Sequence, residues 1–282
     1  MSSAVERRAS NAESHIIGIA DDEFRLFQRF ILAEAGVSLA DTKRALVTGR
    51  LNRRLRERGC VSYRDYHRLL KDDDEERQRA VDLLTTNETY FFREPSHFDV
   101  LAAQARAQAR KTQPFRVWSA ACSSGEEVYS IAMTLAATLG FDSPWEVLGS
   151  DINVEVLRRA RRGHYPMTRI DGIPKDYLHR FCLKGKGRQT GTLLVTRELR
   201  ERVRFRQINL NTSLPRLPQF DAIFLRNVMI YFQSATKQAV IDRLRGRLIL
   251  GGQLFIGHSE SLNGLRAHGL QPMRGSVYVR KV

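Results

Sequence analysis

The sequence predicts an α/β protein, with a doubly wound, mostly parallel sheet that follows a small N-terminal helical domain. From Phe115 onward, short runs rich in β-branched and aromatic residues alternate with segments of helical period, which is the pattern of repeated strand-helix-strand units. Before Phe92, apolar residues recur at helical spacing only. Because the chain has 282 residues, it is long enough to bury a substantial core.

The first part should contain four short helices. Apolar periodicity places them at 22–36, 40–58, 62–71 and 74–84. Gly36 and Gly59 stand where helix C-caps are expected, because glycine adopts the left-handed conformation without strain. A fifth segment, 96–111, is rich in Ala and Gln and predicts a linking helix.

The second part should contain the sheet. The expected strands are 115–120, 145–150, 204–208, 221–225, 253–257 and 277–280. The expected helices are 126–139, 154–161 and 235–247. Strands that alternate with helices in this way form a parallel sheet with helices on both faces.

These elements divide the chain into four regions. We expect a flexible tail at 1–20, a helical domain at 21–92, a linking helix at 93–112 and the sheet domain at 113–282. Inside the sheet domain, the segment 180–204 breaks the alternation, because glycines flank short β-like runs where a crossover helix should lie. This segment predicts a small antiparallel β insertion.

Composition favours a globular cytoplasmic protein. Hydrophobic residues make up 42% and charged residues 27% of the chain, and no apolar run approaches the roughly 20 residues that span a bilayer. Residues 1–20 contain no continuous apolar stretch like that of a signal peptide. Cys60, Cys122 and Cys182 are odd in number and widely spaced, which predicts reduced thiols rather than disulfides or a zinc site.

A basic surface is expected on the second helix. The net charge is +15, and the segment 43–58 holds seven cations against few acids. The cations are Lys43, Arg44, Arg50, Arg53, Arg54, Arg56 and Arg58. Such a helix is either a solvated face or a docking surface for an acidic partner. Aromatic residues do not interleave with these cations, so nucleic-acid binding is not expected.

The most informative segment runs from Val117 to Ser130 and reads VWSAACSSGEEVYS. An apolar strand enters a turn of small residues, and the next helix opens with Glu126 and Glu127. Small residues let a ligand approach the backbone, and a helix N-terminus offers unpaired N–H groups. Two acids should repel a pyrophosphate, so a cationic, hydroxyl-rich ligand such as S-adenosylmethionine fits better. Alternatively, both acids only stabilise the helix dipole.

Polar residues also follow the expected strands. Asp151 follows the second strand, Asn209 and Leu210 the third, and Arg226 and Asn227 the fourth. Ligands bind outside the carboxyl ends of parallel strands, and an acid there can accept both hydroxyls of a ribose. Asp151 could instead cap the helix that begins near Val154.

Five blocks in this order resemble the chemotaxis receptor methyltransferases, which esterify glutamates on bacterial chemoreceptors. Along the chain they are 84–94 (LTTNETYFFRE), the turn at 117–130 quoted above, 149–152 (GSDI), 220–232 (FDAIFLRNVMIYF) and 257–261 (GHSES). The similarity extends from about Asp22 to the C-terminus. Ser124 replaces an expected Thr and Val128 a frequent Pro; neither change removes a polar ligand group.

The resemblance implies a set of site residues and a reaction. The implied cofactor is S-adenosylmethionine, which leaves as S-adenosylhomocysteine, without a metal. The residues that would line its pocket are Asn87, Thr89, Arg93, Glu127, Asp151, Asn209, Leu210, Arg226 and Asn227. Arg93, if it does not pair with Glu94, would orient the substrate carboxylate, and Tyr231 would position the reacting groups from the opposite wall. A glutamate is already ionised at neutral pH, so no general base is required.

Other residues near these motifs are expected to be structural. Phe91 and Phe92 should pack at the domain junction, Met229 and Ile230 should pack in the core, and His258 and Glu260 should pack within their loop. The resemblance further implies that the basic helix 43–58 docks on the receptor's cytoplasmic helical bundle and that the insertion 180–204 captures a receptor tail peptide. A nucleic-acid methyltransferase and a non-catalytic sensor remain the rival interpretations.

Overall fold

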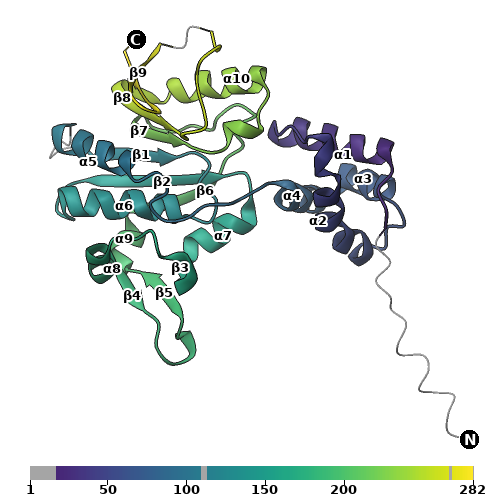
Figure 1. Cartoon of the computed structure of the whole chain (residues 1–282), viewed down its shortest axis with the longest axis horizontal. Coiled ribbons are helices and arrows are strands. Elements are labelled where there is room, and N and C mark those ends of the chain that lie inside the picture. The colour runs from purple at the N-terminus through teal and green to yellow at the C-terminus, as the bar shows by residue number, and fades with distance from the viewer. Residues whose placement is uncertain (1–16, 109–112, 267–268, 282) are drawn as a thin grey trace, which may run out of the picture.

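A computed structural model describes residues 17–108, 113–266 and 269–281 (Figure 1). Most of the tail expected at 1–20, and the end of the linking helix expected at 96–111, lie outside these ranges. The helices and strands form a sheet part and a smaller helical part beside it (Figure 1). Among the described residues, no helix is both long and apolar enough to cross a membrane.

The helical part contains four α-helices, as expected. They are α1 (Asp21–Ala35), α2 (Arg44–Glu57), α3 (Tyr63–Asp72) and α4 (Asp74–Leu84), with a short 3-10 turn η1 (Asp41–Lys43) before α2. Gly36 caps α1 with φ 71°, and the side chains of Ser62 and Asp73 cap α3 and α4. Phe27 stacks on Tyr66 and meets the edge of Tyr63, so aromatic packing joins α1 to α3.

The main sheet has seven strands in the order β6-β2-β1-β7-β8-β10-β9. Their bounds are β1 Phe115–Ser119, β2 Trp145–Asp151, β6 Val203–Gln207, β7 Phe220–Leu225, β8 Leu248–Ile256, β9 Leu270–Arg274 and β10 Val277–Arg280. The first five strands in that order are parallel, and β10 and β9 are antiparallel. The expected doubly wound sheet is therefore confirmed.

Two strand predictions differ from the structure. β8 begins at Leu248, five residues before the expected start at Gln253, and β9 was not expected. Gly251 and Gly252 hide the beginning of β8, because glycines inside a strand look like a turn. In β9, four of the five residues are exposed, Pro272 among them, which obscures the alternating pattern.

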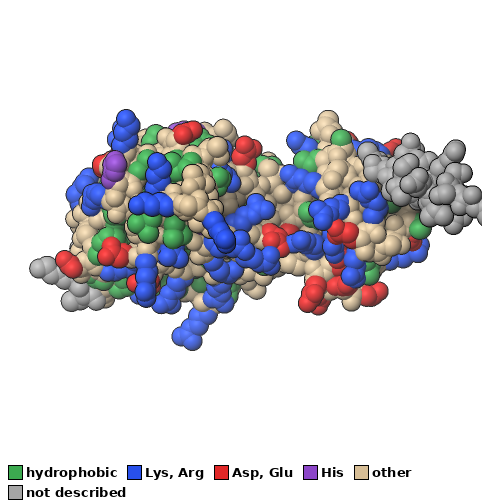
Figure 2. All heavy atoms as spheres, turned by 90° about the horizontal axis from the view of Figure 1, so that it is seen from below, with side chains coloured by type: hydrophobic (Ala, Val, Ile, Leu, Met, Phe, Trp, Pro, Cys, Tyr) green, Lys and Arg blue, Asp and Glu red, His purple; other side chains and the backbone are tan. Residues whose placement is uncertain are grey.

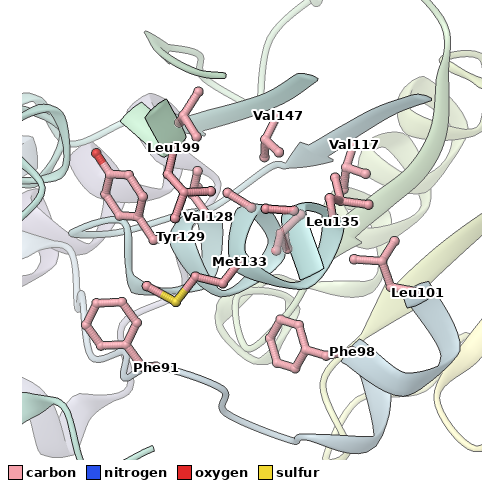
Figure 3. Close-up of a cluster of buried hydrophobic side chains, with 14 of the residues drawn as sticks. Phe91, Phe98, Leu101, Val117, Val128, Tyr129, Met133, Leu135, Val147 and Leu199 are labelled. Atoms are coloured by element: carbon pink, nitrogen blue, oxygen red, sulfur yellow. The ribbon is translucent and has the colours of Figure 1, made fainter. Parts of the chain in front are cut away.

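Helices cover both faces of the main sheet. They are α5 (Ser96–Gln108), α6 (Glu126–Leu139), α7 (Val154–Arg162) and α10 (Ser234–Arg245). On one face, Val117 and Val147 pack with Phe98 and Leu101 of α5 around α6 (Figure 3). On the other face, Trp118 joins the core beneath α10. Val117 and Trp118 are neighbours in β1, so this strand is buried on both sides.

A second, three-stranded sheet lies below the first (Figure 1). Its order is β3-β5-β4, all antiparallel, with β3 at His164–Pro166, β4 at Cys182–Lys184 and β5 at Thr192–Val195. Helices α8 (Lys175–Phe181) and α9 (Arg197–Glu201) flank it, with the 3-10 turns η2 (Met167–Arg169) and η3 (Gly187–Gln189). The antiparallel insertion is present, but the predicted bounds 180–204 were wrong. β3 begins before residue 180, and β6 of the main sheet already starts at Val203. β3 was missed because a strand of three residues is too short to show a hydrophobic period.

Candidate functional site

A cavity of about 470 Å³ opens at the carboxyl ends of β1, β2 and β7. Its walls come from the main sheet, from residues 84–89 after α4, and from residues 35–50 of the helical part. All ten residues predicted for the site line it: Asn87, Thr89, Arg93, Glu127, Asp151, Asn209, Leu210, Arg226, Asn227 and Tyr231. A cavity of this volume suits a ligand the size of a nucleoside derivative.

Asp151 ends β2 and is 7% exposed. One carboxylate oxygen accepts the N–H of Ser123 at 2.8 Å and the other accepts the N–H of Asn153 at 3.0 Å. Burial raises the pKa of Asp151 to about 6, against the opposing effect of these backbone hydrogen bonds. The helix cap of α7 is Asn153, not Asp151. Each oxygen of Asp151 therefore keeps a lone pair that can accept a hydroxyl from the cavity.

Glu126 and Glu127 have different surroundings, and Glu127 is the one that the resemblance assigned to the pocket. Glu126 is fully buried, accepts the hydroxyl of Ser124 at 2.7 Å and lies 3.0 Å from the guanidinium of Arg169. Glu127 lines the cavity, where its carboxylate accepts the hydroxyl of Ser119 at 2.7 Å. Burial raises the pKa of Glu127. Of the two acids, only Glu127 is placed to meet a ligand.

Arg226 is a buried cation with two carboxylate neighbours. Its side chain is 1% exposed and lies 3.2 Å from Glu127 and 3.3 Å from Glu94. It also donates to the carbonyl of Arg93, and its Nε and Nη1 atoms are buried without a hydrogen-bond partner. Because Nη1 is the atom that lies 3.2 Å from Glu127, Arg226 holds the acids of the site in place, and only its Nε atom lacks both a hydrogen bond and an ion pair among the described residues.

Arg93 and Tyr231 lie on different segments of the wall. The guanidinium of Arg93 lies 5.6 Å from the ring centroid of Tyr90 and donates to the carbonyl of Glu88 at 3.4 Å. Glu94 pairs with Arg226 instead, so Arg93 is not held by the alternative contact considered from the sequence. The carbonyl of Tyr231 accepts the N–H of Ser38 from the helical part at 2.8 Å.

The remaining predicted residues shape the cavity with groups that partly serve the protein itself. The amide of Asn209 donates to the carbonyl of Glu34 at 2.6 Å and accepts the N–H of Asn211 at 2.9 Å. The carbonyl of Asn87 accepts the Ser123 hydroxyl at 2.8 Å. Leu210 is buried in the core beneath α10. Asn209 thus retains only one N–H and one lone pair for a ligand.

Some of the residues expected to be structural are buried near the site. Phe91, Phe92 and Met229 are buried. Ile230 is 51% exposed and lines the cavity, so the prediction that it packs in the core was wrong. An isoleucine in an apolar run looks like core, but the 3-10 turn η4 (Met229–Tyr231) directs neighbouring side chains to different sides.

Several cavity residues carried no sequence motif. Val37, Ser38, Lys43, Leu46 and Arg50 enter from the helical part. The guanidinium of Arg50 donates to the carbonyls of Leu83, Leu84 and Thr85 at 2.9 to 3.3 Å, which fixes the end of α4 beside the cavity. In the sequence, the one feature that drew attention to Arg50 was its place in the predicted basic helix.

The basic helix is more paired than its sequence indicates. Arg44 meets Asp21, Arg53 meets Glu57, and Arg54 and Arg58 meet the buried Glu76. Lys43 and Arg56 have no ion pair within the described part of the chain. Lys and Arg side chains are nevertheless abundant on the face where the two parts of the molecule meet (Figure 2).

Glu94, His97 and His258 bring three possible ligand atoms within 4.8 Å of one another. Arg226 lies 3.3 Å from the same Glu94 oxygen, so a positive charge is already present there. Burial and Arg226 lower the pKa of His97 to about 4, and its Nε2 atom lies 2.8 Å from the Ser276 hydroxyl. We therefore infer that Glu94, His97 and His258 hold Arg226 in place. That the protein binds no metal remains a prediction.

Comparison with known families decides which proteins build such a site. Residues 87–279 match the family model "CheR methyltransferase, SAM binding domain", and residues 22–85 match "CheR methyltransferase, all-alpha domain". The chain belongs to the CheR methyltransferase family. The two family models meet at residues 85–87, in the loop that lines the cavity.

Curated members of the CheR family are similar over most of their length. The chain is 44% identical to chemotaxis protein methyltransferase 2 of Pseudomonas aeruginosa, over 85% of this chain and 86% of that protein. It is also 44% identical to the chemotaxis protein methyltransferase of Escherichia coli, over 88% and 87%. The chain is therefore a methyltransferase with a domain that binds S-adenosylmethionine, as the resemblance implied.

Proposed function

We propose that this protein transfers the methyl group of S-adenosylmethionine to glutamate side chains of bacterial chemoreceptors, forming methyl esters. The observation that carries the proposal is the convergence of Asp151, Glu127, Arg93 and Tyr231 on one cavity in a chain of the CheR family. The proposed substrate places the reaction at the cytoplasmic part of a receptor.

The cavity residues fit the chemistry of the cofactor. The free lone pairs of Asp151 suit the two ribose hydroxyls, and the carboxylate of Glu127 suits the cofactor's ammonium. Leu210 offers an apolar surface for the adenine ring, and the remaining amide capacity of Asn209 can bond its edge. The Nε atom of Arg226 has no hydrogen-bond partner among the described residues and can donate to the cofactor's carboxylate. When bound, the cofactor supplies an electrophilic methyl group on its sulfonium.

The protein's own contribution to the reaction is alignment and dehydration. An ionised glutamate oxygen forms a bond to the methyl carbon while the carbon–sulfur bond breaks and sulfur keeps the electron pair. Arg93 binds the second oxygen of that carboxylate and so directs the first oxygen along the line of attack. Tyr231 lines the opposing wall and excludes water, which would otherwise solvate the carboxylate and lower its reactivity.

A methyl-transfer assay tests the proposal directly. The protein is incubated with methyl-labelled S-adenosylmethionine and a panel of the host's chemoreceptors, and the products are treated with base. We expect label on receptors that base releases as methanol, because carboxyl methyl esters are base-labile. Label that resists base, or label on nucleic acid alone, would contradict glutamate esterification. Cofactor binding without any transfer would favour a sensor.

Two surfaces suit receptor docking. Lys43 of η1 and Arg53 and Arg56 of α2 are exposed cations, and we propose that they attract an acidic helical bundle. In the small sheet, β4 is an edge strand and its Leu183 is 56% exposed. An extended tail peptide could pair with this edge through main-chain hydrogen bonds, while its side chains contact Leu183.

A further inference from the structure

Glu260 lies in the turn after β8 and was expected only to pack within its loop. Its carboxylate accepts three backbone N–H groups, from Gly257 at 2.7 Å, Asn227 at 2.9 Å and Met229 at 2.7 Å. Asn227 and Met229 belong to the loop after the neighbouring strand β7. A single carboxylate therefore connects the carboxyl ends of two parallel strands.

The loop that Glu260 holds follows β7 and forms part of the cavity wall. Its cavity-lining members are Arg226, Asn227, Val228, Ile230, Tyr231 and Phe232. Asn227 has φ 56°, a left-handed conformation that few residues other than glycine adopt. Backbone N–H groups around such a residue form a concave site for an anion. The carboxylate of Glu260 occupies this position and favours the unusual backbone.

The surroundings leave this arrangement little freedom. A Cβ atom on Gly257 would lie 2.6 Å from the side-chain nitrogen of Asn227 and 2.9 Å from the carboxylate of Glu260. From the other side, the carboxylate of Glu94 accepts the N–H of His258 at 3.2 Å and contacts the Asn227 amide at 3.5 Å. Two carboxylates thus fix the same loop, Glu260 through its backbone and Glu94 through the side chains of Arg226 and Asn227.

We propose that Glu260 is a positioning residue for methyl transfer. By binding the N–H groups of Asn227 and Met229, it fixes the loop that presents Arg226, Asn227 and Tyr231 to the cavity. The inference rests on the proposed function, because it concerns the alignment of those side chains with cofactor and substrate. The proposed docking surfaces on α2 and β4 belong to other segments, so receptor binding should not depend on Glu260.

Steady-state kinetics of Glu260→Gln test this role. The Gln amide is as large as the Glu carboxylate, but its NH2 group is a donor and cannot accept a hydrogen bond from a backbone N–H group. The loop therefore loses at least one of its hydrogen bonds to residue 260. We expect kcat to fall roughly 10- to 100-fold, while KM for the receptor stays within about twofold. Glu146→Gln, which removes a carboxylate paired with Arg116, should leave kcat unchanged. A folded Glu260→Gln protein with wild-type kcat would overturn the inference.

Hydrogen–deuterium exchange provides a readout that does not need activity. In Glu260→Gln, the amides of Asn227, Met229 and Gly257 should exchange faster than in the wild type, and equal exchange would refute the positioning role. If the wild-type protein transfers no methyl group, the proposed function fails while exchange still decides the role of Glu260. Should Glu260→Gln not fold, Glu260→Asp keeps the charge with a shorter reach; it should show an intermediate kcat, and a wild-type kcat would again overturn the inference.

Discussion

Asp151 shows how a buried carboxylate can serve the backbone and a ligand together. It already accepts the N–H groups of Ser123 and Asn153, and its free lone pairs face the cavity. Asp151→Ala should weaken S-adenosylmethionine binding by roughly 2–3 kcal/mol, the range for charged hydrogen bonds. Isothermal titration calorimetry on the folded variant measures this loss. Unchanged affinity would remove Asp151 from the cofactor site.

The raised pKa of Asp151 predicts that cofactor binding depends on pH. The ionised form accepts the ribose hydroxyls, and its pKa in the cofactor-free protein is about 6. Affinity should therefore decrease as pH falls from 7 to 5, with proton release on binding. The contribution of Asp151 to folding stability changes with pH in the opposite direction. Because folding raises its pKa from 3.8, this stabilising contribution is present at low pH and is lost as pH rises through 6. Calorimetry from pH 5 to 8 should show this step in affinity, and Asp151→Asn should lack it.

Arg93 is expected to act on turnover more than on cofactor binding. Its guanidinium has one weak hydrogen bond and the ring of Tyr90 as its contacts in the protein, so it remains available to a substrate carboxylate. Arg93→Ala should lower kcat on the order of 100-fold, as for removal of a donor to developing or transferring charge. Tyr90→Ala, which keeps the guanidinium but removes the ring beneath it, should cause a smaller loss. Normal turnover in Arg93→Ala would exclude the proposed role.

At the scale of the element, α2 separates structural from docking cations. Arg54 holds Glu76, so only the exposed Arg53 and Arg56 are suitable for charge reversal. Changing both to Glu should raise KM for the receptor, more at low salt than at high salt, because exposed charges are screened. Cofactor affinity should not change. The pair Arg197→Glu and Arg274→Glu alters the net charge equally on other elements; an equal rise in KM there would show that α2 has no special part.

The edge of the small sheet can be tested without removing its core. β5 is the central strand, and its Leu193 and Val195 are buried, so excising 184–196 would expose the interior. On either side of β4, Gly185 donates to Thr192 and Phe181 accepts from Thr196, so the alternation of an antiparallel pair directs the N–H of Lys184 outward. Lys184→Pro should reduce binding of receptor tail peptides about tenfold, whereas Lys184→Ala should not. Equal affinities in calorimetry would defeat the tail-capture proposal.

At the scale of the whole molecule, the cavity exists because the helical part is bonded to the strand ends. Asn209 donates to Glu34 of α1, and Tyr231 accepts from Ser38. On the other side, Asp82 of α4 accepts the N–H of Val154 at 3.0 Å. These contacts join residues far apart in sequence, so the helical part forms one wall of the site instead of a separate unit.

The predicted site residues of the sheet domain follow the ends of parallel strands, which place such positions at the same edge. Asn87, Thr89 and Arg93 come from the segment after α4 and were predicted from the family resemblance alone. Their individual roles were less accessible. Glu127 rather than Glu126 was assigned to the pocket only through the family resemblance, and the structure supplies the difference in surroundings: Glu126 pairs with Arg169, whereas Glu127 lines the cavity. Likewise, Glu260 appears as an ordinary polar turn residue until the loops after β7 and β8 are placed side by side.

The sequence by itself determined the order of helices and strands, the doubly wound sheet and the family, because these follow from local period and from short motifs. Only the tertiary structure decided which charges are free. The sequence placed Arg50 and Arg54 on a basic helix and Arg226 at the site, but it did not show that each is bound by carbonyls or carboxylates from distant segments. The physical reason is that a buried charge costs free energy unless a partner of opposite charge or a carbonyl lies beside it. Which residue supplies that partner depends on proximity in three dimensions, which the local sequence pattern does not encode.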